Sequence, residues 1–108
     1  MPNSELFKLK AELCKTFADA KRLAIINELR NGERAVGELA HTLNIPQAVA
    51  SRHLALLRNR GMVRPRREGI NVYYRLTDPK IVEACDLIHQ VLLNSLTENK
   101  ELAERLTA

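Results

Sequence analysis

The chain has 108 residues and a formal net charge of +4 at pH 7, a size that allows one hydrophobic core and excludes two. Its residues are 45% apolar but only 4% aromatic, so the core must be built from aliphatic side chains, as in packed helices. No apolar run approaches the length of a membrane span and the first residues lack the order of a secretion signal, so we expect a cytoplasmic protein with a single domain over residues 1–108.

Two helices are expected before residue 33. The first covers about residues 5–17, with Ser4 as its cap, because a serine hydroxyl can accept a hydrogen bond from a free N–H of the first turn. The second covers about residues 20–30, is capped by Asp19 and ends at Asn31-Gly32, a strong helix stop. We expect the second helix to be the centre of the fold. The first has an apolar face made of Leu6, Leu9, Leu13 and Phe17.

Residues 36–57 predict two short helices that meet at a tight polar turn. Asn44 tolerates the left-handed conformation that ends a helix, and Pro46 fits the first turn of the next helix, where its missing N–H costs nothing. Apolar residues recur at three- and four-residue steps in both halves. They are Val36, Leu39, Ala40 and Leu43, then Val49, Ala50, Leu54 and Leu57. This pattern indicates a helix-turn-helix, although an ordinary helix pair has the same periodicity.

The second of these helices carries small and hydrogen-bonding side chains opposite its apolar stripe, as does a helix that contacts base edges in the major groove. These side chains are Gln47, Ala48, Ser51 and Arg52. Near the start of a helix, such residues are placed to enter the groove.

Residues 62–76 predict a basic β-hairpin. Two runs rich in β-branched and aromatic residues are joined around Glu68-Gly69, and glycine permits the positive φ that a hairpin turn needs. Since strand side chains alternate, only about half of the arginines can face one surface, and we expect Arg66 and Arg67, nearest the tip, to face DNA. Tyr73 is expected to pack on the strands rather than stack on a base. The arginines of the stretch are Arg64, Arg66, Arg67 and Arg75.

Four segments of the chain together resemble the ArsR/SmtB family of bacterial and archaeal transcriptional repressors. They are residues 19–25 (DAKRLAI), 36–40 (VGELA), 51–57 (SRHLALL) and 67–76 (REGINVYYRL). The resemblance covers about residues 5–93. It implies a mainly helical winged helix-turn-helix, with four helices, two strands and a final helix in that order. It further implies a homodimer that releases an operator when a metal, metalloid or redox signal arrives. Pro46 departs from the family, which often has Ser or Thr at this position.

A final helix is expected to begin after Thr77 or Asp78, with Pro79 in its first turn, where proline is favoured. Its apolar positions repeat at alternating three- and four-residue steps, the spacing of helices that pair. They are Ile81, Ala84, Cys85, Ile88, Leu92 and Ser95. This face can pack on its own domain, but the resemblance implies dimerisation through residues 1–18 and 78–96. The tail, residues 97–108, can extend the helix or fray.

These features favour a regulator that binds double-stranded operator DNA, with a basic stripe from Arg52 to Arg75 that attracts phosphates. The rival hypothesis is a protein-interaction module in which the hairpin arginines are only a solvated face. His53 can contact DNA or be a packed residue of the helix-turn-helix. The expected DNA contacts are Gln47, Ala48, Ser51, Arg52, His53, Arg64, Arg66 and Arg67.

We do not expect an enzyme. The three histidines, His41, His53 and His89, lie in different expected elements. The sequence contains no Gly-rich phosphate loop, no H-E-x-x-H and no C-x-x-C motif, so it gives no support to a phosphate-transfer or zinc site.

The metal sites that the resemblance implies are not expected to form here. One of them needs four ligands on and beside the last helix, and three of the four are missing. The matching positions hold Asp78, Lys80, Val91 and Asn94. The other site needs paired cysteines where this chain has Ala35 and Gly37.

Cys14 and Cys85 are the remaining candidates for sensing, because they lie on the two helices assigned to the dimer. No cofactor is required. The pair can bind an arsenite-type metalloid, or be oxidised by a sulfur or oxidant signal, which would shift the dimer interface and release the operator. In the alternative, both thiols are small apolar packing groups and the inducer is another ligand.

Overall fold

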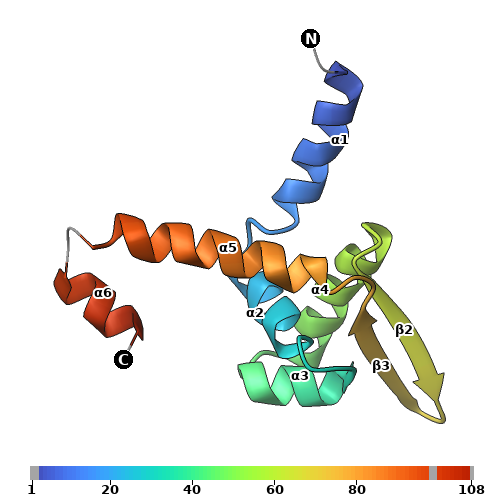
Figure 1. The fold of residues 1–108 in the computed structure, drawn as a ribbon. Helices are drawn as coiled ribbons and strands as arrows, with labels where there is room; N and C mark the ends of the chain where they lie inside the picture. Colours follow the sequence, from blue (N-terminus) through green and yellow to red (C-terminus); the bar gives the residue numbers. More distant parts are fainter. Residues whose placement is uncertain (1–2, 98–99, 108) are drawn as a thin grey trace.

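A computed structural model describes residues 3–97 and 100–107 of the chain. Helices α2, α3 and α4 pack together beside a β-hairpin, while α1 and α5 lead away from this body (Figure 1). The predicted order of four helices, a hairpin and a final helix is confirmed, with a short strand and a C-terminal helix added. The elements are α1 (Ser4–Lys15), α2 (Ala20–Glu28), β1 (Arg34–Ala35), α3 (Val36–Leu43), α4 (Gln47–Asn59), β2 (Val63–Glu68), β3 (Asn71–Leu76), α5 (Lys80–Ser95) and α6 (Lys100–Thr107).

At the starts of α1, α2 and α5, a side-chain oxygen accepts hydrogen bonds from free backbone N–H groups. The prediction that Ser4 caps α1 is wrong by one residue, because Asn3 Oδ1 accepts hydrogen bonds from the Glu5 and Leu6 amides at 2.9 and 3.4 Å. The Asp19 cap of α2 is confirmed, since its Oδ1 accepts from the Lys21 and Arg22 amides at 2.8 and 3.1 Å.

The start of α5 resolves the choice between Thr77 and Asp78. Asp78 Oδ1 accepts a hydrogen bond from the Lys80 amide at 2.9 Å, and Pro79 already has helical angles of φ −62° and ψ −19°. The Thr77 hydroxyl instead donates to the Gly61 carbonyl oxygen at 2.7 Å. Asp78 is therefore the cap, and Thr77 fastens the end of the hairpin to the end of α4.

The turn of the helix-turn-helix is built on Asn44, as predicted. Asn44 ends α3 in the left-handed conformation, with φ 54° and ψ 49°, and the Ile45 amide donates back to the Ala40 carbonyl at 3.0 Å. Pro46 is the residue before α4 rather than part of its first turn, with an extended ψ of 142°. Its fixed φ still suits the entry into a helix.

The sheet has three antiparallel strands in the order β1-β3-β2. Strands β2 and β3 pair from Val63↔Leu76 to Glu68↔Asn71, which leaves Gly69 and Ile70 as a two-residue turn. Gly69 adopts φ +62°, the positive angle that such turns require of their first residue. Strand β2 is an outer edge of the sheet. The two-residue β1 was not predicted, because it is too short to show alternation.

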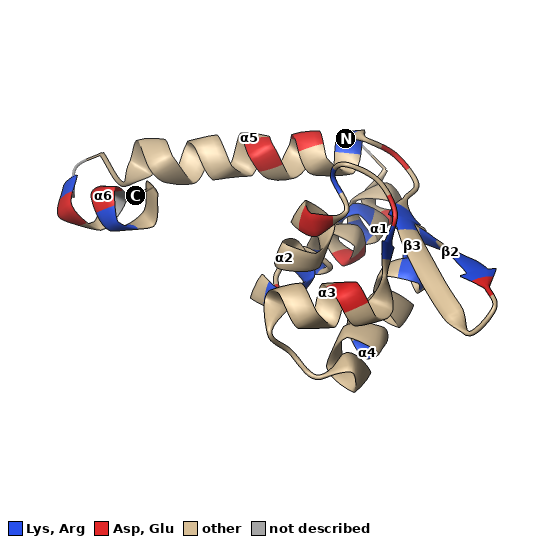
Figure 2. Ribbon diagram, turned by 90° about the horizontal axis from the view of Figure 1, so that it is seen from below, with Lys and Arg blue, Asp and Glu red and all other residues tan. Residues whose placement is uncertain are grey.

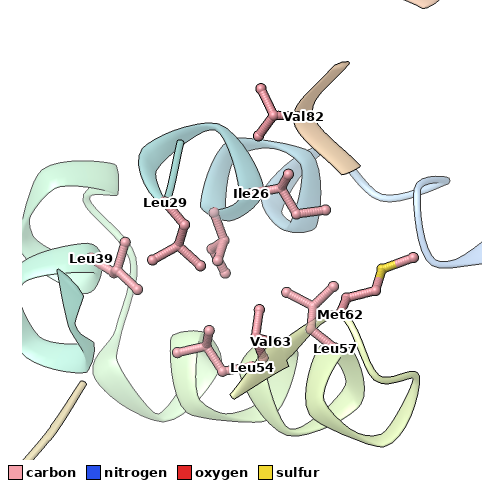
Figure 3. Close-up of a cluster of buried hydrophobic side chains, with 9 residues drawn as sticks. Ile26, Leu29, Leu39, Leu54, Leu57, Met62, Val63 and Val82 are labelled. Carbon is pink, nitrogen blue, oxygen red and sulfur yellow. The ribbon is translucent and has the colours of Figure 1, made fainter. Parts of the chain in front are cut away.

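The hydrophobic core lies between α2, α4 and the base of the hairpin (Figure 3). It is aliphatic apart from one thioether, as the composition predicted. Helix α2 supplies Ile25 and Ile26, and its C-cap Leu29 adds a third member, which agrees with the expected central position of this helix. Each such side chain stabilises the fold by about 1.5–3 kcal/mol when fully buried. The cluster consists of Ile25, Ile26, Leu29, Leu39, Leu54, Leu57, Met62, Val63 and Val82.

Helices α1 and α5 add little to this core. No residue of α1 is buried, and Val82 is the one buried residue of α5. The radius of gyration of the Cα atoms is 15.8 Å, against about 13 Å for a compact domain of this length, because both helices extend from the body. Their large exposed apolar side chains are Leu6, Phe7, Leu9 and Leu13 on α1, and Leu87, Ile88, Val91 and Leu92 on α5.

The tail does not continue α5. After a break it forms the separate helix α6, while Glu98, Asn99 and Ala108 of the expected tail lie outside the described residues. None of the helices in the described ranges combines the length and apolarity needed to cross a membrane.

Helices α3 and α4 with the following hairpin form a winged helix-turn-helix, in which the hairpin, residues 63–76, is the wing.

Candidate nucleic-acid interface

The outward face of α4 carries the side chains that the sequence assigned to base contacts. Ala50, Leu54 and Leu57 are buried against the body, which turns the opposite side of the helix to solvent. The exposed residues at the start of α4 are Gln47, Ala48, Ser51 and Arg52. Arg52 makes no side-chain hydrogen bond or ion pair within residues 3–97 and 100–107, so its guanidinium is free to bind a base or a phosphate.

A groove of about 360 Å³ separates the start of α4 from the tip of the wing. It offers a hydroxyl and two side-chain amides, from Ser51, Gln47 and Asn71, beside apolar groups. These neutral donors and acceptors can hydrogen-bond the edges of bases or the oxygens of a backbone. The groove is lined by Ala35, Val36, Gly37, Glu38, Gln47, Ser51, Ile70, Asn71 and Val72.

Basic residues are spread along the wing (Figure 2), and the strand register divides its arginines between two faces. In the observed register Arg66 pairs with Tyr73 and Arg67 with Val72, and neighbouring residues of a strand point to opposite faces. Residues 63, 65 and 67 of β2 share one face, and Val63 is buried in the core, so Arg67 belongs to the face that turns toward the body. Arg66 belongs to the other face, together with Arg64 and Arg75. The expectation that Arg66 and Arg67 act on one surface is therefore wrong.

Arg66 is already held by two carboxylates. Its guanidinium forms ion pairs with Glu33 and Glu68 and lies 4.8 Å from the centre of the Tyr73 ring. Hydrogen bonds to Glu33 and then to Glu68 raise the pKa of Arg66, and the same Arg66 bond lowers the pKa of Glu33. The sequence places Arg66 among the expected DNA contacts and does not predict that Glu33 and Glu68 bind it. Tyr73 is a strand packing residue, as predicted.

His53 lies on the body side of α4. It is half-buried, and burial lowers its pKa, while Asp19 acts in the opposite direction and Arg22 adds to the lowering. These groups belong to the first turn of α2 and its cap. Of the two roles that the sequence left open for His53, this position favours the packed one.

The two thiols have different surroundings. Cys14 is exposed on α1, whereas Cys85 is half-buried on α5 and packs against the core. Burial raises the pKa of Cys85, and Asp86 adds to this, while Arg30 opposes it. Arg30 donates two hydrogen bonds to Asp86, at 3.1 and 2.8 Å, which links the turn after α2 to α5. A protonated, half-buried thiol is a weaker nucleophile than an exposed one.

No group of three or more His, Cys, Asp or Glu side chains that could hold a metal ion occurs in the part of the chain that the structure describes. Ala35 and Gly37 line the groove and carry no ligand atoms in their side chains.

A helix-turn-helix with an exposed second helix, followed by a basic wing, defines a class of DNA-binding transcriptional regulators. Residues 19–64 match the model of a family described as bacterial regulatory protein, arsR family. The chain is 34% identical, over its whole length and 96% of the relative, to an uncharacterized HTH-type transcriptional regulator, Rv0081, of Mycobacterium tuberculosis. The chain belongs to the ArsR family of transcriptional regulators.

Another relative is the HTH-type transcriptional repressor SmtB of M. tuberculosis, which is 39% identical over 71% of this chain. The match spans 57% of the length of that repressor. The crystal structure of Rv0081 superposes with a TM-score of 0.78 at 35% identity, covering 86% of this chain and 94% of the other. The homodimeric winged helix-turn-helix domain of Mb0332 from Mycobacterium bovis, solved by NMR, gives a TM-score of 0.79 at 31% identity, with 91% of each chain covered.

Proposed function

We propose that this chain is a homodimeric transcriptional repressor that binds operator DNA through the start of α4 and through the wing. One observation carries the proposal: the exposed face of α4, with Arg52 unpaired, lies beside a groove that leads to the tip of the wing. Arg67, on the face of the wing that turns toward the body, is a second cation for the same duplex, and Arg64 lies on the other face. The rival protein-interaction module would not need this arrangement.

DNA binding should be steeply salt-dependent and should depend on Arg52. The probe is a duplex pool enriched from random sequence by the parent protein. We expect Arg52→Ala to weaken binding by on the order of 1–3 kcal/mol if the guanidinium contacts a base in two places. Arg58→Ala is the matched control, because Arg58 is exposed on the same helix but lies in its last turn, at the opposite end from the proposed base contacts. Fluorescence anisotropy over a salt series measures both.

Equal losses for the two variants would mean that only net charge matters, and would remove the base-contacting role of Arg52. A parent protein that binds no duplex even at low salt would instead support the rival interaction module.

Two protomers are proposed to pair through α1 and α5, the helices within residues 1–18 and 78–96. The apolar side chains of these helices are exposed in one protomer, as with Ile88 at 69% and Leu9 at 61%. Exposed apolar helix faces of this kind are covered in most soluble proteins. A two-fold pair would bury it and would present two α4 helices to half-sites about one helical turn apart.

The signal that releases DNA is proposed to act at Cys14 and Cys85. Both residues lie on the helices assigned to the dimer, so a change at either thiol alters the surface that fixes the spacing of the two α4 helices. An arsenite-type metalloid would form one As–S bond to each thiol, and each thiol proton would leave with a hydroxyl group of the metalloid as water. An oxidant or sulfur donor would react first with the exposed Cys14.

Arsenite or a polysulfide is expected to release the duplex from the parent protein and not from Cys14→Ser or Cys85→Ser. Thermodynamic coupling of this kind typically changes affinity by about 5- to 150-fold. Alanine variants at both positions keep an apolar group and test whether packing, rather than the thiol, is needed. If both serine variants respond as the parent does, the thiols are packing groups and the inducer binds elsewhere.

A further inference from the structure

Arg66 is the centre of a group of side chains on the face of the wing that turns away from the core. We call this group, Arg66 with Glu33, Glu68 and Tyr73, the wing clamp. Arg66 Nε donates to both carboxylate oxygens of Glu33 at 3.2 and 3.1 Å, and Nη2 donates to Glu33 Oε1. Nη1 donates to Glu68 Oε2 at 2.9 Å. All three nitrogens of the guanidinium are thus engaged.

The clamp crosses the whole sheet. Arg66 lies on β2, and Glu33 directly precedes β1 on the far side of β3. The guanidinium therefore passes over β3, above the Tyr73 ring at 4.8 Å, to reach its partner. Two of the three strands and the turn that follows α2 are joined by this one side chain.

The clamp lies where the wing leaves the body. Strand β1 pairs with β3 only at Arg34↔Tyr74 and Ala35↔Tyr73, so residues 67–72 form a two-stranded ribbon without a third strand. A two-stranded ribbon has little stability of its own, and its direction depends on what holds its base. The ribbon carries Arg67 and Ile70, and Ile70 is 97% exposed at the tip.

We infer that the wing clamp aims the tip of the wing at DNA, and that Glu33 and Arg66 are positioning residues for duplex binding rather than phosphate contacts. This inference rests on the proposed function. One guanidinium shared by two carboxylates leaves no excess positive charge for a phosphate. Arg67 forms no side-chain ion pair or hydrogen bond with the described residues. It is therefore a free cation that the clamp would hold in position to bind a phosphate of the duplex.

Removing the charge of Glu33 distinguishes a positioning role from a purely electrostatic one, because the two roles change the affinity for the duplex in opposite directions. A carboxylate close to a duplex repels its phosphates, so replacing it with a neutral amide should strengthen binding if charge alone matters. If Glu33 fixes the direction of the wing, the same replacement should weaken binding, because the ribbon loses its anchor. The two explanations predict opposite changes from one substitution.

The test is a double-mutant cycle with Glu33→Gln, Arg66→Gln and the combined variant on the enriched duplex pool. We expect each single variant to weaken binding by roughly three- to tenfold, with the combined variant no weaker than Arg66→Gln alone, since both remove the same link. Glu83→Gln is the control for charge, because Glu83 is exposed on α5 and forms no side-chain bond among the described residues. It should leave binding unchanged.

Footprinting with hydroxyl radicals at saturating protein gives a second measurement. In Glu33→Gln, protection at the flanks contacted by the wing should fade while protection at the sites of α4 remains; a general loss of folding would weaken both. Tighter or unchanged binding by Glu33→Gln, or a footprint identical to that of the parent, would overturn the inference and leave the proposed function standing. A parent protein that binds no duplex would overturn the proposed function itself, and this inference with it.

Discussion

Ile88→Glu is expected to separate the dimer and to weaken operator binding by about 10²-fold or more. Ile88 is the most exposed of the large apolar residues on α5, and a carboxylate there would be buried without a partner if two α5 helices paired. Loss of the dimer removes the second half-site from each binding event, and that linkage typically multiplies affinity by about 10²–10⁴. Light scattering after size exclusion and anisotropy measure the two effects.

Gln90→Glu is the matched control for this prediction. It introduces the same charge on the same exposed helix, but Gln90 lies about 200° round the helix from Ile88. We expect this variant to remain dimeric and to bind DNA as the parent does. An Ile88→Glu protein that is still a dimer at micromolar concentration would show that the apolar face of α5 is not the interface.

Leu54→Ala is expected to lower the free energy of unfolding by about 2–5 kcal/mol. Leu54 has no exposed surface and belongs to the core cluster beside Leu57 and Ile26. Its truncation removes apolar contacts and leaves a cavity that the surrounding helices fill only in part. In a domain of this size a loss of 1 kcal/mol lowers Tm by about 4–8 °C, so thermal unfolding followed by circular dichroism resolves the effect.

Leu106→Ala removes the same atoms from an exposed position on α6 and should change Tm little. Both variants must be compared at one protomer concentration, because dimer formation stabilises the folded state by mass action. A Leu54→Ala protein that melts with the parent would mean that the core does not depend on α4 in the way the burial of Leu54 indicates.

Local signals account for the parts of the fold that were predictable from the sequence. Asn44, Asp19 and Gly69 each act on their own neighbours, through a left-handed angle or a hydrogen bond two or three residues away. The apolar stripe of α4 also follows from its spacing, because the body covers one side of the helix. Such features need no knowledge of distant residues.

The features that were missed depend on contacts between distant segments. Glu68 lies only two residues from Arg66, but Glu33, its other partner, is far away in the chain, and nothing in the sequence indicates that Glu33 and Arg66 meet. Strand β1 has only two residues and exists because β3 offers it a partner. Whether His53 is buried or exposed depends on where the first turn of α2 packs against α4. The spacing of apolar residues in α4 alone does not predict this packing.

The outer position of β2 in the sheet has a consequence for the behaviour of the protein at high concentration. A free strand edge can recruit the edge of another molecule and start an aggregate. Here the edge contains Pro65, which has no N–H to offer to an incoming strand. The exposed Arg64 and Arg67 of the same strand carry charges that repel a second copy of this edge. The wing can thus project into solvent without joining the wings of other molecules into fibres.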